Sequence, residues 1–194
     1  MRTPTARLFV AVWPDENLRG EIAGVVGELK KADADIKWVS AENLHLTLKF
    51  LGEVETGKVE EIVSTLKSVR QKSFEMEVGN LGAIPNSRHP KTIFADVTSG
   101  GKPLQELAQA IGNTLEKTGF ERDPRAFIPH VTLGRVKSPK NLQKYFLKMS
   151  EHKGQIFGKI SVTRFYLVKS DIRPQGPAYT EIAEIPLENG GENE

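Results

Sequence analysis

Residues 45–48 read His-Leu-Thr-Leu, and residues 130–133 read His-Val-Thr-Leu, 85 positions further along the chain. In an extended strand, alternate side chains point to opposite faces, so the histidine and the threonine of each motif share one face. The two apolar residues of each motif lie on the other face and anchor the strand. Two such strands facing one another bring together two imidazoles and two hydroxyls, which is the composition of a paired acid–base site.

The same offset of 85 relates the apolar runs that precede the two motifs. Residues 8–13 form the first run and residues 92–97 the second, with Phe9 aligned with Phe94 and Val12 with Val97. Both runs are expected to be strands. Alternation of strands and helices occurs in many α/β proteins, but two histidine motifs at one offset indicate a duplication.

Helical patterns follow at corresponding places in both halves. Apolar residues at helical spacing occupy residues 18–29 and 104–115, with Asp15 placed to cap the first helix and Pro103 in the first turn of the second. Further helical patterns cover residues 59–69 and 139–149, and strands are expected at residues 74–78, 158–169 and 179–187. Each half therefore predicts the order strand, helix, histidine strand, helix, strand.

The composition excludes several classes of protein and site. The 194 residues carry 27 basic and 25 acidic side chains, a net charge of +2, and no cysteine, which excludes disulfides, thiolate nucleophiles and cysteine-based zinc sites. The apolar run at residues 8–13 is much shorter than the roughly 20 residues of a membrane span, and it lacks a signal-cleavage site. We therefore expect a cytoplasmic protein with no membrane association and, by default, a monomer.

Paired imidazoles suit the cleavage of a phosphodiester without a metal. An ordinary histidine pKa near 6.5 allows either ring to take or give a proton near neutral pH, and two positive rings in one cleft would repel, which favours a singly protonated pair. Thr47 and Thr132 are placed to donate to phosphate oxygens. Strict alternation puts Lys49 on the face of His45, where it would add charge. Arg135 has the wrong parity, although a bulge at Gly134 would redirect it.

Other chemistries match the sequence less well. It has no His-x-x-x-His pattern, no Gly-x-Ser-x-Gly elbow and no glycine-rich phosphate loop. We therefore predict no metal and no cofactor.

The motifs and their surroundings resemble the two-histidine phosphoesterase superfamily, in particular its RNA 2′,3′-cyclic phosphodiesterase branch, also called the 2′–5′ RNA ligase family. The resemblance is carried by residues 38–52 and 127–135, and residues 7–12 and 84–86 also fit. One departure is Gly134, where alanine is commoner in the family, and it affects the aim of Arg135.

The resemblance implies an α+β, bilobal fold in which pseudo-twofold duplicated units place antiparallel sheets along a central cleft. Residues 1–187 would form one bilobal domain whose lobes are built mainly from residues 7–85 and 91–169, and residues 188–194 would be a flexible tail. The segment 81–90 is interpreted as the crossover between the lobes.

The resemblance also implies an enzyme that hydrolyses RNA-terminal 2′,3′-cyclic phosphates to 2′-phosphates without a metal. His130 would activate the water and His45 would protonate the departing 3′ oxygen, although the sequence leaves exchanged roles open. Thr47 and Thr132 would hold the phosphate oxygens with the help of Arg135. The reverse reaction, joining such an end to a 5′-hydroxyl, is also implied.

Several alternatives stay open. Phe9 belongs to an apolar run typical of a core, or it stacks on a terminal base. Cationic residues are candidates for the rim that receives the RNA backbone, namely Lys37, Arg88, Lys91, Arg125 and Lys137. The substrate could instead be a small cyclic nucleotide or an ADP-ribose cyclic phosphate. A binding module without catalysis is a third reading, although binding alone needs no matched acid and base.

Overall fold

The computed structural model describes residues 3–124, 126–174 and 176–189. The elements in chain order are β1 (Thr5–Val12), α1 (Glu16–Lys30), β2 (Ile36–Trp38), η1 (Ala41–Asn43), β3 (Leu46–Glu55), η2 (Thr56–Lys58), α2 (Val59–Leu66), β4 (Phe74–Ile84), β5 (Thr92–Ser99), α3 (Gly101–Glu116), β6 (His130–Val136), α4 (Leu142–Ser150), β7 (Ile156–Val162), β8 (Arg164–Arg173) and β9 (Gly176–Pro186). None of the helices in these ranges is long and apolar enough to cross a membrane.

All the strands belong to one antiparallel sheet with the order β7-β4-β5-β6-β3-β1-β8-β9, and β2 pairs with β6 beside this path. The two histidine motifs lie in the central neighbours β3 and β6. Counting outward from this pair, β1 corresponds to β5, β8 to β4 and β9 to β7. The strand order therefore has the pseudo-twofold character that the duplicated motifs predict.

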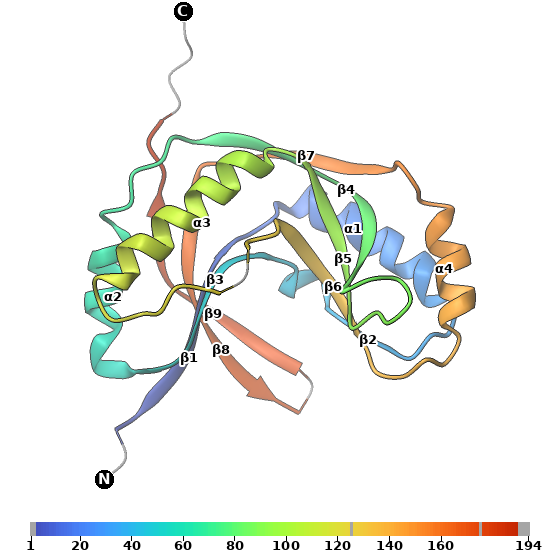
Figure 1. The fold of residues 1–194 in the computed structure, drawn as a ribbon, viewed down its shortest axis with the longest axis horizontal. Helices are drawn as coiled ribbons and strands as arrows, with labels where there is room; N and C mark the ends of the chain where they lie inside the picture. The colour runs from blue at the N-terminus through green and yellow to red at the C-terminus, as the bar shows by residue number, and fades with distance from the viewer. Residues whose placement is uncertain (1–2, 125, 175, 190–194) are drawn as a thin grey trace, which may run out of the picture.

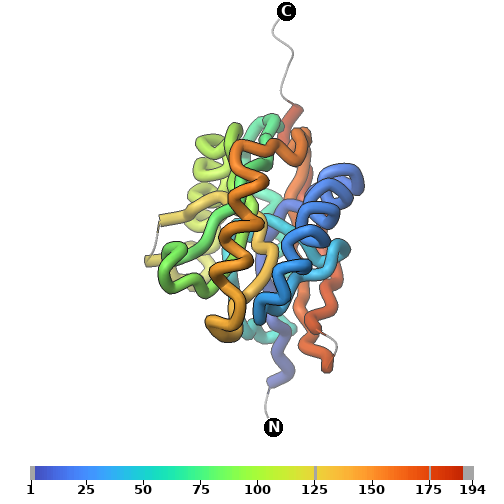
Figure 2. Tube along the Cα trace, turned by 90° about the vertical axis from the view of Figure 1, so that its right-hand side faces the viewer, coloured from blue at the N-terminus to red at the C-terminus, as the bar shows by residue number. Residues whose placement is uncertain are grey.

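Each half of the sheet combines elements from both sequence repeats. Helix α1 packs on β7 and α4, whereas α3 packs on β3 and α2. Figure 1 shows α2 and α3 together at one end of the molecule and α1 and α4 at the other, and Figure 2 shows α1 and α4 side by side. Strands are exchanged as well, since β4 pairs with β5 and β8 pairs with β1. The two repeats are thus interlocked, so that neither half-sheet is formed by one repeat alone.

The helices cover one face of the sheet, and the main core lies between them and the strands. Its members include Leu46 and Val131 from the central strands, both fully buried. A much smaller cluster of Phe9, Ala11 and Val168 lies on the opposite face, packed with three partly buried rings. This second cluster borders the motif strands on the face that the helices leave open.

Several elements differ from the sequence-based expectation. The strand expected at residues 158–169 is two strands, β7 and β8, because the chain turns at Thr163, whose carbonyl accepts a hydrogen bond from Leu187. Strand β4 continues to Ile84 and occupies part of the expected crossover, and the short β2 was not predicted. The expected tail strand is the greater part of β9.

The first residue of the expected tail, Glu188, is hydrogen-bonded to another part of the chain. Glu188 donates through its backbone N–H to Gln71 and accepts from the N–H of Ser73, which ties it to the chain before β4. Residues 190–194 lie outside the described part of the chain.

The offset of 85 holds for the motifs but not for the strands before them. Ala11 pairs with Thr47, whereas Phe94 pairs with Thr132, so Ala11 and not Phe9 corresponds to Phe94. The difference is two residues. Because a shift of two preserves the direction of every side chain in a strand, the faces predicted for these strands are unaffected.

Candidate active site

The register of the two central strands brings both motifs to one face of the sheet. Leu46 pairs with Val131, and continuing this antiparallel register places each histidine level with the threonine of the other motif. Leu46 and Val131 point into the main core, so the residues before and after them point the other way. We call this open side of the sheet the site face, defined by His45, Thr47, His130 and Thr132.

The two histidines are diagonal neighbours on the site face. In a regular antiparallel ladder such neighbours lie about 7–8 Å apart, which is a span that one phosphate group can bridge by hydrogen bonds to both rings. The pairing of β3 with β6 at the centre of the sheet therefore brings together two histidines that are 85 residues apart in the sequence.

Both imidazole rings are held by the same local contact. Nδ1 of His45 lies 2.7 Å from the carbonyl oxygen of Asn43, and Nδ1 of His130 lies 2.7 Å from the carbonyl oxygen of Ile128. Since a carbonyl can only accept, each Nδ1 carries the proton and donates it. In the neutral ring this leaves the lone pair on Nε2, which is then the atom able to take or give a proton at the site.

The surroundings of the two rings differ. The ring of His45 is enclosed by Phe9, Trp13 and Tyr179, at centroid distances of 5.0, 5.5 and 5.1 Å. Phe94 lies 5.4 Å from the ring of His130. His45 is thus the more enclosed member of an otherwise matched pair.

This enclosure changes the proton affinity of His45. Burial lowers the pKa of His45, the hydrogen bond to the Asn43 carbonyl opposes that change, and the charge of His130 adds to the lowering. The influence of His130 is the one expected for two imidazoles in one site, where a proton on one ring opposes a proton on the other. The free protein consequently favours the neutral form of His45.

A one-residue bulge follows the threonine in each motif strand. In β3, Ala11 pairs with Thr47 and Val10 with Lys49, which leaves Leu48 as the extra residue. In β6 the same irregularity falls at Leu133. Beyond each bulge the alternation is reversed relative to the motif, so the faces assigned by strict alternation no longer hold.

The bulge in β3 overturns the prediction for Lys49. Its side chain is 4% exposed and lies away from the site, where Nζ is 2.9 Å from the carbonyl oxygen of Glu121 and 3.2 Å from Oδ2 of Asp123. Phe50 takes the place on the site face instead, opposite Phe9 in the ladder. The Phe50 ring is 63% exposed and its centroid lies 6.3 Å from that of Phe9.

Burial decides between the two interpretations of Phe9. Only 3% of Phe9 is exposed, and its ring is packed against His45, Phe50 and Tyr179. A base therefore has no open face of Phe9 on which to stack in this structure. The exposed aromatic ring on this part of the site face is its neighbour Phe50.

The bulge in β6 directs Arg135 to the site face. Arg135 pairs with Thr92, which shares a face with Phe94 and hence with His130. Burial raises the pKa of Tyr179, and the positive charges of Arg135 and Arg7 oppose that rise. The redirection expected near Gly134 therefore occurs, with the extra residue one position earlier.

Gly134 itself is turned toward the main core. A Cβ atom at this position would lie 2.7 Å from Cγ2 of Ile36 and 3.2 Å from Cε3 of Trp38, both in β2. Glycine thus allows β2 to approach β6 closely. This approach also brings Lys37 opposite Arg135 on the same face.

The other predicted rim residues are less closely tied to the site. Arg88, Lys91 and Lys137 are exposed and make no ion pair with the described residues, and Arg125 lies outside them. Lys37 and Arg135 likewise have no carboxylate within 4 Å in the described ranges. Two unpaired cations opposite one another beside the histidines form a position that attracts an anion.

Sequence reasoning did not identify Trp13, Phe50 or Tyr179 as parts of the site. Phe50 lies within the first motif region, but its exposure depends on the bulge. Tyr179 comes from the last strand and reaches His45 only through the pairing of β9 with β8 and of β8 with β1. No spacing in the sequence relates it to the motifs.

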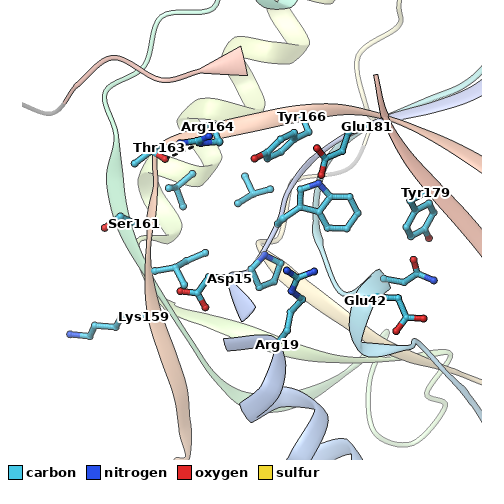
Figure 3. Close-up of a pocket in the computed structure, with 16 residues that line it drawn as sticks. Asp15, Arg19, Glu42, Lys159, Ser161, Thr163, Arg164, Tyr166, Tyr179 and Glu181 are labelled. Carbon is cyan, nitrogen blue, oxygen red and sulfur yellow. Dashed lines mark hydrogen bonds between the residues drawn. The ribbon is translucent and has the colours of Figure 1, made fainter. Parts of the chain in front are cut away.

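A cavity of about 860 Å³ is lined in part by two of the rings that contact His45. Trp13 and Tyr179 form part of its wall, and Figure 3 shows polar side chains from several elements around it. The residues labelled there include Asp15 and Arg19 at the start of α1, Glu42 from η1, and Arg164, Tyr166 and Glu181 from β8 and β9.

The sequence of this chain matches the model of one known protein family. The model of the LigT like Phosphoesterase family matches residues 12–94 and 96–179, which together cover most of the chain. The chain belongs to this family. The resemblance drawn from the two motifs is thereby confirmed.

Curated relatives and solved structures agree with this assignment. An RNA 2′,3′-cyclic phosphodiesterase of Methanothermobacter thermautotrophicus is 34% identical over 93% of this chain and 98% of its own length. One from Archaeoglobus fulgidus is 36% identical over 91% of this chain and 97% of its own length. The crystal structure of E. coli LigT complexed with 3′-AMP is 25% identical, with a TM-score of 0.75 over 95% of this chain and 99% of that chain. The predicted α+β fold class is confirmed.

Proposed function

We propose that this protein hydrolyses the 2′,3′-cyclic phosphate at the 3′ end of RNA to a 2′-phosphate, with His45 and His130 as the acid–base pair. The observation that carries the proposal is the pairing of Leu46 with Val131, since it places two matched imidazoles and two threonines on one open face. The curated relatives named RNA 2′,3′-cyclic phosphodiesterase support the choice of substrate.

The reaction needs two proton transfers at one phosphorus atom. A neutral imidazole takes a proton from water as the water oxygen bonds to phosphorus, and a protonated imidazole gives a proton to the 3′ oxygen as the P–O3′ bond breaks. The products are a 2′-phosphate and a 3′-hydroxyl. Each transfer typically contributes about 10²–10⁴-fold in rate. The free Nε2 atoms of His45 and His130 supply both transfers.

The remaining polar groups on the site face stabilise the negative charge of the substrate phosphates. The hydroxyls of Thr47 and Thr132 donate to the non-bridging oxygens as negative charge develops on them. Arg135 adds a cation beside this position, and Lys37 opposite it binds the phosphate of the preceding nucleotide. The exposed ring of Phe50 stacks on the terminal base.

The lowered pKa of His45 bears on which histidine is the base and which is the acid. Because burial lowers the pKa of His45, its neutral form is favoured, which suits His45 as the base. The family resemblance implies the opposite assignment. A substrate whose 3′ oxygen is replaced by sulfur separates the two, because a thiolate departs without a proton. The alanine variant of the acid then recovers activity on the sulfur substrate, and the variant of the base does not.

The primary test uses an oligoribonucleotide with a terminal 2′,3′-cyclic phosphate in the presence of excess chelator. We expect a product heavier by one water, sensitive to phosphatase and carrying its phosphate on the 2′ oxygen. Turnover of a mononucleotide alone would indicate a small-molecule substrate, and binding without turnover would indicate a binding module. Loss of activity in chelator that is restored by a metal would contradict the metal-independent mechanism.

A further inference from the structure

The cavity beside His45 is distinct from the position of the reacting phosphate but shares two walls with it. Trp13 and Tyr179 both line the cavity, and their rings are also in contact with the ring of His45. At about 860 Å³ it is within the usual range of small-ligand sites and exceeds what one aromatic base requires. A molecule bound at the histidines can therefore extend past these two rings into the cavity.

The lining has the chemistry of a nucleoside site. Trp13, Tyr166 and Tyr179 present aromatic surface for stacking, and every base has a face that stacks regardless of sequence. The carboxylates of Glu42 and Glu181 accept hydrogen bonds from ribose hydroxyls or exocyclic amines.

Two further donors in the lining are uncommitted. Arg19 has no carboxylate partner within 4 Å among the described residues and can bind a phosphate oxygen. Nε1 of Trp13 is buried without an acceptor in the same ranges. Oxygen atoms of a bound nucleotide would be acceptors for these two donors.

The cavity and Phe50 lie on opposite sides of His45 along the chain direction of β3. Glu42 and Asn43, which line the cavity, come three and two residues before His45, and Phe50 comes after Thr47 and the bulge. A terminal base stacked on Phe50 consequently leaves the cavity free. The site as a whole has room for one nucleoside on each side of the histidines.

We propose that this cavity is a second nucleoside-binding subsite, filled by a nucleoside other than the one that carries the cyclic phosphate. The proposal rests on the proposed function. The second nucleoside has two sources with the same chemistry. It is either the preceding nucleotide of the same strand or the 5′-hydroxyl nucleoside of a strand to be joined. In the second case the 5′-hydroxyl oxygen replaces water in bonding to phosphorus, O3′ departs with a proton, and a 2′–5′ linkage results.

Two variants alter the cavity without touching the histidines. Tyr166→Ala removes a stacking surface, and Arg19→Ala removes the uncommitted cation of the lining. Arg70→Ala is the control, because Arg70 pairs with Glu188 outside the cavity. The substrates are adenosine 2′,3′-cyclic phosphate, the dinucleotide ApA ending in a cyclic phosphate, and the same dinucleotide with an excess of 5′-hydroxyl ApA.

We expect both cavity variants to open the mononucleotide at a rate within about twofold of the wild type. If the preceding nucleotide occupies the cavity, KM for the dinucleotide rises about 10-fold, as loss of one stacked base predicts. If the acceptor occupies it, the yield of 2′–5′-joined product falls about 10-fold while hydrolysis is unchanged. Equal KM values and equal yields in the wild type and both variants would overturn the proposal.

Failure of the proposed function gives a different pattern. A wild type that opens neither substrate removes the enzymatic proposal, whereas a wild type that opens both with no effect of the variants removes only the subsite. If the wild type opens neither substrate, binding still tests the subsite. The dissociation constants of the dinucleotide and the mononucleotide are then measured in the same variants, and their ratio shows whether the cavity binds a second nucleoside.

Discussion

At the scale of single residues, the two histidines make the same hydrogen bond to a backbone carbonyl but differ in the aromatic rings around them. Each donates through Nδ1 to the carbonyl two positions earlier, which aims Nε2 at the site. His45 is also enclosed by three aromatic rings, which makes its proton affinity lower than that of an ordinary histidine. The first property comes from the chain directly before each motif, while the second comes from residues on other strands.

Replacing either site histidine should abolish most of the activity. We expect His45→Ala and His130→Ala each to lower kcat by about 10²–10⁴-fold, because each removes one proton transfer. Steady-state kinetics on the cyclic-phosphate oligonucleotide measures this. His152→Ala is the matched control, since His152 pairs with Gln155 after α4 and should leave kcat unchanged. Retention of most activity by either site variant would remove that residue from the mechanism.

The lowered pKa of His45 predicts a pH-dependent stability. Below about pH 6.5, the ordinary pKa, the unfolded chain takes up a proton at this residue that the folded protein resists. The unfolded state therefore binds more protons, and the free energy of unfolding falls as the pH drops through this range. Urea denaturation at pH 7 and pH 5 should show a smaller difference for His45→Gln than for the wild type. An NMR titration of His45 with a midpoint above 6.5 would contradict the expected direction.

Phe50 should contribute to binding and little to folding. Its ring is 63% exposed, so Phe50→Ala removes a surface for the base without opening the core. We expect KM for the RNA substrate to rise about 10-fold with an unchanged melting temperature. Leu147→Ala on α4 replaces a similarly exposed apolar side chain as the control. Equal KM values for the two variants would argue against stacking on Phe50.

At the scale of elements, the bulges in β3 and β6 decide which side chains reach the site. Sequence alternation correctly pairs each histidine with its threonine, because these lie before the bulge. It fails for Lys49, which lies after the bulge and pairs with Asp123. A bulge depends on how a strand meets its partner, and the sequence of one strand alone does not show this.

Gly134 should be required for the close approach of β2 to β6. We expect Gly134→Ala to lower the free energy of unfolding by about 1–3 kcal/mol, because its Cβ would overlap Ile36. Gly24→Ala in α1 is the opposite case, with nothing within 4 Å of the new atom, and should stabilise the protein by about 0.5–1 kcal/mol. Denaturant titrations of both variants test this, and a neutral Gly134→Ala would show that β2 yields freely.

At the scale of the whole molecule, the interlocked repeats bring distant segments to the site. The pairing of β9 with β8, and of β8 with β1, carries Tyr179 to His45, and the pairing of β2 with β6 carries Lys37 to Arg135. The small net charge of the protein is therefore compatible with a local concentration of cations near the histidines.

The paired cations predict a measurable salt effect. We expect Lys37→Ala to reduce the slope of log KM against log salt concentration by about 1 for an oligonucleotide, since one phosphate contact is lost. The slope for a mononucleotide cyclic phosphate should be unchanged. Lys102→Ala, at an exposed ion pair on α3, serves as the control. An unaltered slope for the oligonucleotide would remove Lys37 from the RNA-binding surface.

The sequence by itself determined the duplicated order of elements, the central motifs and the face shared by each histidine with its threonine. These follow from local rules, since alternation in a strand and spacing in a helix depend only on neighbours along the chain. The tertiary structure alone decided the bulge in β3, the exposure of Phe50, the exact position of the bulge in β6 and the enclosure of His45 by Trp13 and Tyr179. Each of these depends on pairing between segments far apart in the chain, and the packing of the whole sheet against its helices stabilises that pairing.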